Sequence, residues 1–206
     1  MTASAMPDPI SAIVVHTRLE DGRKVCLRAV RPDDEARMRR GIDLLSDQSR
    51  YLRFFSGAPA LPDRVITSLV AVDGHRHLAW GAILSDDPQH PAIGAVHAVR
   101  TGPESANAEF AVGILDAFHG LGLARMLTAV LLIHCRREGI EQMDVQILAE
   151  NHAAASLVRS LGGDKRGSSQ GVSDYVIDTA AALAHLQRGP GPAGLNAVFA
   201  AFAEFL

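Results

Sequence analysis

Residues 118–127 read Phe-His-Gly-Leu-Gly-Leu-Ala-Arg-Met-Leu, a turn with two glycines that leads directly into the most regular helical pattern of the chain. From Leu123 onward the apolar residues Leu127 and Val130 recur at helical spacing, and Gly139 is a natural stop for the helix. This pattern predicts a helix that packs one apolar face against the protein core.

The two glycines of the turn, Gly120 and Gly122, suggest a binding role. Glycine has no Cβ, so the backbone can adopt conformations closed to other residues and a ligand can approach its N–H groups. The first turn of a helix also has N–H groups without intrahelical partners and the positive end of the helix dipole. Together these features predict a bound phosphate or pyrophosphate. A glycine pair can also serve only to bring a helix close to a strand, and this alternative stays open.

The segments on either side of the turn and helix have the pattern of strands. Residues 108–115 are mostly apolar or small, and residues 143–148 alternate apolar and polar side chains. The resulting order of strand, turn, helix and strand favours the phosphate-binding interpretation.

The turn also resembles a family signature. It is similar to the Gln/Arg-x-x-Gly-x-Gly/Ala motif of the GNAT superfamily of acyl-CoA-dependent N-acyltransferases, with His119, Gly122 and Ala124 at the three defined positions. In that family the backbone amides of this loop hold the pyrophosphate of coenzyme A. His119 departs from the usual glutamine or arginine, and this departure is expected to matter less than the loss of a glycine would.

A second segment, residues 151–162, resembles the family's Asn-x-x-Ala-x-x-Leu-Tyr-x-x-x-Gly helix. The asparagine, Asn151, matches, as do the alanine, the leucine and the final glycine. Val158 stands where many members have a tyrosine thought to protonate the leaving thiolate. The proton is then expected from water, from Asn151 as a hydrogen-bond donor, or from another residue.

The resemblance covers residues 24–178 and implies an α/β (α+β) fold of the GNAT type. This is a mixed, mostly antiparallel central sheet of six to seven strands flanked by helices, with a V-shaped splay between two central strands. Acetyl-CoA is the implied co-substrate. The residues expected to bind it are Ala111, Val112, Gly113, His119, Gly120, Leu121, Gly122, Leu123, Ala124 and Asn151. Backbone N–H groups of residues 111–113 would stabilise the oxyanion, and Gly113 is expected to form a bulge that splays its strand from the neighbouring one.

Glu109 is the expected general base. It lies in a strand whose other residues are apolar or small, where desolvation favours a carboxyl that accepts a proton. It also corresponds to the Ala-Glu-Val/Ile-Ala pattern on which the similar lysine acetyltransferases carry their proposed base. A glutamate in a strand is often only solvent-facing, and this alternative stays open.

Residues 49–55, Ser-Arg-Tyr-Leu-Arg-Phe-Phe, concentrate aromatic side chains in a chain with only 5% aromatic residues. The run is similar to the catalytic domain of bacterial protein lysine acetyltransferases, and in GNAT proteins this helix borders the acceptor-substrate groove. Tyr51, Phe54 and Phe55 are therefore candidates for the groove wall, although aromatic residues at helical spacing usually pack into the core.

The composition of the chain indicates which partners and which cellular compartment to expect. The formal net charge is −3 and no lysine-rich tract is present, so no nucleic acid partner is expected. Cys26 and Cys135 have apolar neighbours typical of reduced thiols, and neither a signal peptide nor a membrane-spanning run is apparent, so we expect a soluble cytoplasmic protein. His75, His77 and His97 have no accompanying cluster of carboxylates or thiolates, so no metal site is expected.

Three regions are expected along the chain. Residues 1–22 form an N-terminal extension with the first hairpin strand, residues 23–180 a GNAT acyltransferase domain, and residues 181–206 a linker with a hydrophobic tail helix. The tail places Val198, Phe202 and Phe205 on one side of that helix. Such a face predicts docking on the chain's own domain or on a second copy, which would make a homodimer.

The function predicted first is transfer of an acetyl group from acetyl-CoA to a primary amine, with a protein lysine as the expected acceptor and Glu109 as the base. Two alternatives stay open. The acceptor could be a small metabolite or an antibiotic, and the chain could be an acyl-CoA-binding regulatory module without turnover.

Overall fold

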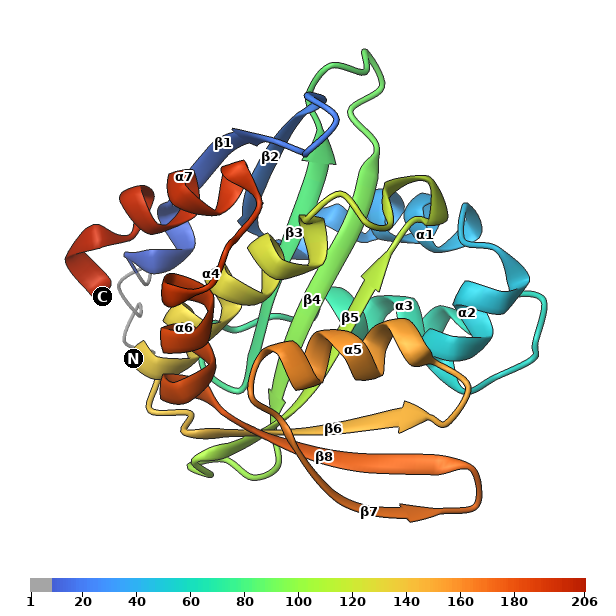
Figure 1. The fold of residues 1–206 in the computed structure, drawn as a ribbon. Coiled ribbons are helices and arrows are strands. Elements are labelled where there is room, and N and C mark those ends of the chain that lie inside the picture. Colours follow the sequence, from blue (N-terminus) through green and yellow to red (C-terminus); the bar gives the residue numbers. More distant parts are fainter. Residues whose placement is uncertain (1–8) are drawn as a thin grey trace, which may run out of the picture.

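The computed structural model describes residues 9–206, which form one eight-stranded sheet with helices on both faces (Figure 1). The strand order is β1-β2-β3-β4-β5-β6-β8-β7, and all neighbours are antiparallel except the parallel pair β5 and β6. The strands are β1 (Val14–Arg18), β2 (Lys24–Ala29), β3 (His77–Leu84), β4 (Ala92–Arg100), β5 (Asn107–Ile114), β6 (Gln142–Leu148), β7 (Asp164–Ser169) and β8 (Val172–Asp178).

The mixed, mostly antiparallel sheet confirms the predicted fold class, but the predicted count of six to seven strands is wrong. The additional strand is β1, which the sequence predicted as the first strand of a hairpin but placed outside the acyltransferase domain. It pairs with β2 along its whole length, and Gly22 adopts a positive φ of 89° in the turn between them. Because β2 also pairs with β3, the first strand belongs to the same sheet as the others.

The helices form a layer on each face of the sheet. In Figure 1, α1, α2 and α3 lie behind the sheet and α4, α5 and α6 lie in front of it, while α7 runs beside β1. No helix of residues 9–206 is long and apolar enough to cross a membrane. The helices are α1 (Glu35–Asp43), α2 (Asp47–Phe54), α3 (Asp63–Val70), α4 (Leu123–Arg137), α5 (His152–Ser160), α6 (Thr179–Arg188) and α7 (Ala193–Ala201).

Helix α4 is the central helix of the front layer. It begins at Leu123 and ends just before Gly139, which has a positive φ of 73°, as the sequence predicted. Its residues 126–135 are all buried, because the helix packs against the sheet on one side and against α6 and α7 on others. The apolar surface is therefore wider than the single face expected from the spacing.

The sheet opens between β5 and β6. These strands pair only over residues Asn107–Glu109 and Gln142–Asp144, and beyond that point β5 continues along β4 alone. This is the predicted V-shaped splay. The expected bulge at Gly113 is wrong, because β4 and β5 stay in unbroken register through Ala95↔Gly113. The splay therefore comes from the short parallel pairing on the other edge of β5.

The C-terminal tail docks on its own chain. Helix α7 packs against β1 and α4, with Leu195, Val198 and Phe202 buried. The Phe202 ring meets the Trp80 ring edge-on at 5.5 Å between centroids. Phe205 is only half-buried. Since the buried residues are covered by the same chain, a second copy is not needed to cover them.

The two cysteines and three of the histidines differ in burial and in the groups they contact. Cys135 is buried, and burial raises the pKa of its thiol, whereas Cys26 is half-buried. His77 Nε2 lies 3.0 Å from His97 Nδ1. His75 faces a carboxylate, with its Nδ1 2.8 Å from Glu138 Oε2.

Candidate active site

A cleft of about 1480 Å³ occupies the V between β5 and β6. It is also bounded by the turn before α4, by the first residues of α4 and α5, and by residues 190–192 of the C-terminal linker. Typical small-molecule pockets measure roughly 300–1,000 Å³. The cleft therefore has room for a long ligand.

The glycine turn forms one end of this cleft. Gly120 and Gly122 have positive φ angles of 73° and 82°, a conformation that glycine adopts at little cost. His119 holds the turn against the end of β5, because its Nε2 donates to the carbonyl oxygen of Ile114 at 2.9 Å. The first-turn amides of α4 have no side-chain cap and no acidic neighbour in that turn. N–H groups without intrahelical partners, together with the helix dipole, suit an anionic group such as pyrophosphate.

Arg125 adds a positive charge that the sequence analysis did not assign. It lines the cleft, and its Nη1 donates to the carbonyl oxygen of Pro190 at 3.0 Å. Its Nε is buried without a hydrogen-bond partner among residues 9–206. A cation in the first turn of a helix is unusual, because it opposes the helix dipole. This position in the sequence could have indicated Arg125 as a binding residue.

The structure brings together all the residues predicted to bind acetyl-CoA except one. Those that line the cleft are Ala111, Val112, Gly113, His119, Gly120, Gly122, Leu123, Ala124 and Asn151. Leu121 does not line it, because its side chain packs against the core and its carbonyl oxygen accepts the N–H of Glu20 at 3.3 Å. Asn151 also caps α5, since its Oδ1 accepts the N–H of Ala154 at 3.0 Å.

The backbone of β5 presents alternate amides to the cleft. The N–H of Leu115 donates to Ile93 on the β4 side, and in an antiparallel ladder every second residue points the same way. Ala111 and Gly113 therefore bond toward β4, while the N–H of Val112 points into the V. Of the three residues expected to stabilise an oxyanion, Val112 has the right orientation.

Glu109 lies at the point where β5 and β6 separate. It is paired in register with Asp144 of β6, and both side chains line the cleft. Glu109 is exposed, so the expected desolvation in an apolar strand is wrong. Successive side chains of a strand alternate between the two faces of the sheet. Glu109 therefore points to the same face as Ala111 and Gly113, the face that carries α2, where solvent reaches the V.

Two of the three aromatic groove candidates border the cleft. Phe54 and Phe55 line it, whereas Tyr51 does not, because it lies on another side of the short helix α2. Phe54 and Tyr51 are half-buried and Phe55 is exposed, so none of them packs fully into the core. Arg53 of the same helix also lines the cleft.

The position of the family tyrosine is filled by Val158, which is 1% exposed and lines the cleft. A hydroxyl is nevertheless present in the cleft, because Tyr175 of β8 lines it as well. The Tyr175 hydroxyl makes no hydrogen bond to another residue in the described part of the chain, and the side chain is buried. Sequence reasoning missed Tyr175 because its strand is distant from the motif.

The Acetyltransferase (GNAT) domain family matches residues 24–164. The chain belongs to the GNAT acetyltransferase family. Its sequence is 31% identical over 144 residues to Acetyltransferase PA5475 of Pseudomonas aeruginosa, covering 70% of this chain and 77% of that protein. This GNAT acetyltransferase is an acyltransferase that uses acetyl-CoA as its co-substrate and an amine as the acceptor.

Solved structures show the same fold. The GNAT domain of S. lividans PAT superposes with a TM-score of 0.73 at 25% identity, covering 80% of this chain and 96% of that chain. Mycobacterium smegmatis RimJ, solved in complex with CoA-disulfide, superposes with a TM-score of 0.60 at 19% identity, covering 93% and 95%. The likeness to RimJ supports the fold of this GNAT acetyltransferase.

Replacing Gly122 with alanine is expected to weaken acetyl-CoA binding by more than tenfold, about 1.4 kcal/mol. An added Cβ would meet Pro192 Cβ at 2.4 Å, and the positive φ would be strained, so the turn must shift. Isothermal titration calorimetry measures the affinity. Gly139→Ala is the matched control, because it has a similar φ but no atom within 4 Å of the added Cβ. Equal affinity for both folded variants would show that the turn does not hold the ligand.

Proposed function

We propose that this acetyltransferase modifies a primary amine of a protein, a lysine side chain, by direct attack on the thioester. The observation that carries the proposal is the pair of carboxylates, Glu109 and Asp144, beside the cleft-facing N–H of Val112. An ammonium is attracted to such a pair, and it must lose a proton before it can attack. The resemblance of residues 49–55 to bacterial protein lysine acetyltransferases supports a protein acceptor.

The proposed roles follow from this arrangement. Glu109 accepts the proton of the attacking amine. The N–H of Val112 donates to the oxygen that gains charge as the amine adds to the carbonyl carbon. Collapse of the adduct forms the amide and breaks the carbon–sulfur bond. The turn at Gly122 and the first amides of α4 position the donor, so much of the catalysis comes from orientation.

An acceptor panel tests this function. The full chain is incubated with acetyl-CoA and, separately, lysine-containing peptides, polyamines and aminoglycosides, and thiol release and product mass are measured. Acetylation of the lysine side chain of a peptide is the expected result. Acetylation of the small amines alone would replace this function with a small-molecule transferase. Binding of acetyl-CoA without thiol release for any amine would instead support a regulatory module.

The hydroxyl of Tyr175 is the proposed proton donor to the leaving thiolate. It lines the same cleft as Val158 and has no hydrogen-bond partner within the described residues. Tyr175→Phe is expected to lower kcat by about 10²-fold, because the thiolate loses its proton donor, with little change in acetyl-CoA affinity. Tyr51→Phe, the other tyrosine of the chain, does not line the cleft and should retain the parent kcat. Parent-like kcat for Tyr175→Phe would exclude this role.

A further inference from the structure

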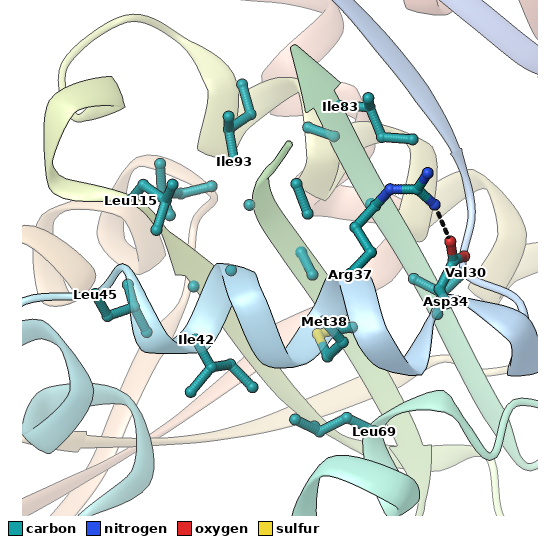
Figure 2. A pocket seen from close by; sticks show the side chains of 18 of the residues that line it. Val30, Asp34, Arg37, Met38, Ile42, Leu45, Leu69, Ile83, Ile93 and Leu115 are labelled. Atoms are coloured by element: carbon teal, nitrogen blue, oxygen red, sulfur yellow. Dashed lines mark hydrogen bonds and ion pairs between the residues drawn. The ribbon is translucent and has the colours of Figure 1, made fainter. Parts of the chain in front are cut away.

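A second cavity, of about 70 Å³, lies between α1 and the sheet. It is lined by Met38, Ile42 and Leu45 of the α1 region, by Ile93 of β4 and by Leu115, which follows β5 (Figure 2). Most of the lining is apolar. The cavity shares residues Arg53, Phe54, Gly113 and Ile114 with the cleft, so the two spaces meet beside the acyl-transfer site.

The cavity exists because small residues follow one another across the strands. Gly81 of β3 pairs with Ala95 of β4, which pairs with Gly113 of β5, and Arg28 of β2 ends the row. Residues paired in register point to the same face, so this row leaves space beneath α1. Three strand spacings of about 4.8 Å make the row about 14 Å long. It leads from the edge of the V toward Arg28.

At the far end of the row, the carboxylate of Asp34 has hydrogen-bond partners. Asp34 accepts hydrogen bonds from Arg28 at 2.6 Å and 2.7 Å and from Arg37 at 2.5 Å. Burial opposes ionisation of Asp34, but the hydrogen bonds to Arg28 and the neighbouring groups prevail and lower its pKa to about 2. Two guanidinium groups therefore share the Asp34 carboxylate, and Asp33 also acts on Arg28, so the charges at this end of the cavity have partners.

Arg53, at the end beside the cleft, has no such partner. Its guanidinium makes no hydrogen bond or ion pair with any residue of the described chain, 9–206, and lies 4.8 Å from the centroid of the Phe54 ring. Its aliphatic part and Nε cover Gly113, at 3.6–3.7 Å from where a Cβ would be. Burial lowers the pKa of Arg53 to about 10, which leaves the side chain charged at neutral pH.

The carboxylates around α2 do not supply the missing partner. Asp47 forms an ion pair with Arg50, and Asp116 accepts hydrogen bonds from Ser46 and Ser49. Arg53 is half-buried where it lines the cleft, so its charge is partly withdrawn from water and no counter-charge offsets this. An unpartnered cation beside the cleft suits an anion that arrives with a substrate.

The direction of attack indicates which substrate carries that anion. Under the proposed function, on which this step rests, the carbonyl carbon lies near the N–H of Val112 and the amine approaches from Glu109. Gly113 lies on the same face of β5 as Glu109 but on the other side of Val112 along the strand. The remaining substituent of the carbonyl carbon, the acyl chain, therefore points toward Gly113 and Arg53.

We propose that Arg53 binds a carboxylate at the distal end of the acyl group, so that the enzyme accepts a short dicarboxylic acyl group such as succinyl from coenzyme A. The transfer forms the bond from the amine nitrogen to the acyl carbon and breaks the carbon–sulfur bond. The amine proton passes to Glu109, the thiolate leaves and is protonated, and the distal carboxylate keeps its charge in an ion pair with Arg53.

A comparison of succinyl-CoA with butyryl-CoA tests the proposal, because the two acyl chains have the same number of carbons and differ in the carboxylate. Calorimetry is expected to show at least tenfold tighter binding of succinyl-CoA to the full chain. Arg53→Met should remove this preference, and Arg53→Lys should retain part of it. Arg64→Met, an exposed arginine of α3 that lines neither cavity, is the matched control and should behave as the parent.

Binding is measured without an amine, so the result does not depend on whether the acceptor is a lysine. A failure of the proposed function would appear only in the acceptor panel. Equal affinity for the two acyl-CoA molecules, or a preference that survives Arg53→Met, would overturn the assignment.

A second arm locates the carboxylate. With acetyl-CoA as donor, an amino acid and its carboxamide are compared as acceptors for the parent and for Arg53→Met. Similar activity of the parent and of Arg53→Met with each acceptor supports the acyl group as the carrier, because the acetyl group has no carboxylate for Arg53 to bind. An Arg53-dependent preference for the amino acid, with no preference between the acyl-CoA molecules, would overturn the proposal. Arg53 would then bind a carboxylate of the acceptor and not of the acyl group.

Discussion

Replacing Phe202 with alanine is expected to lower the free energy of unfolding by about 3–5 kcal/mol, the range for truncating a buried phenylalanine. Phe202 is 0% exposed and packs edge-on against Trp80, whose indole N–H is itself bonded to His134 at 3.1 Å in the core. The variant would leave a cavity between α7 and the sheet. Urea unfolding followed by circular dichroism measures the change.

Phe199→Ala within α7, which ends just before Phe202, is the matched control, because Phe199 is only half-buried and its truncation removes less apolar contact. A clearly smaller loss is expected for it. If the two variants lost the same stability, or if neither lost any, the tail would not be docked through Phe202. A truncation that ends the chain before Leu195 should also lower the melting temperature, because it removes Val198 and Phe202 together.

Replacing Glu109 with glutamine is expected to lower kcat at neutral pH by at least about 10²-fold, because glutamine cannot accept the proton of the attacking amine. The side chain keeps its size, and Glu109 lies away from the turn that binds the donor, so acetyl-CoA affinity should stay close to that of the parent. Steady-state kinetics over a range of pH and a binding titration measure the two effects separately.

Asp144→Asn is the control for Glu109, because the two carboxylates are neighbours in register and line the same cleft. Asp144→Asn removes one negative charge from the same region but leaves the proposed base in place, so it should lower kcat less than Glu109→Gln does. Parent-like turnover and pH dependence for Glu109→Gln would leave Glu109 as a surface residue of the sheet. A large loss in Asp144→Asn alone would move the base to β6.

Local patterns predicted the elements of this protein well. The spacing of apolar residues indicated α4 and its stop at Gly139, and period-two alternation indicated the strands on either side. Such signals are local, because the repeat of a helix or strand is set by its own backbone. The glycines at positions 120 and 122 indicated the turn for the same reason, since a positive φ at low cost is a property of glycine itself.

Errors arose where a feature depends on neighbouring strands. The bulge at Gly113 was expected from the glycine alone, but the opening of the sheet is set by the three-residue pairing of β5 with β6, whose residues lie more than thirty positions apart in sequence. Glu109 is exposed although β4 and β6 pair with it on both sides, because its side chain lies on the opposite face from the buried Ala108 and Phe110. An apolar strand sequence predicts burial on both faces only where helices cover both faces of the sheet.

The sequence by itself determined the elements, the family signature and the glycine turn, because these depend on residues within one or two turns of the chain. Only the tertiary structure decided which groups face the cleft. It directed the N–H of Val112 into the V, brought Tyr175 from β8 to the cleft beside Val158, and left Arg53 over Gly113 without a partner. These placements depend on strand order, register and packing, which join distant residues through contacts that no local pattern of side chains specifies.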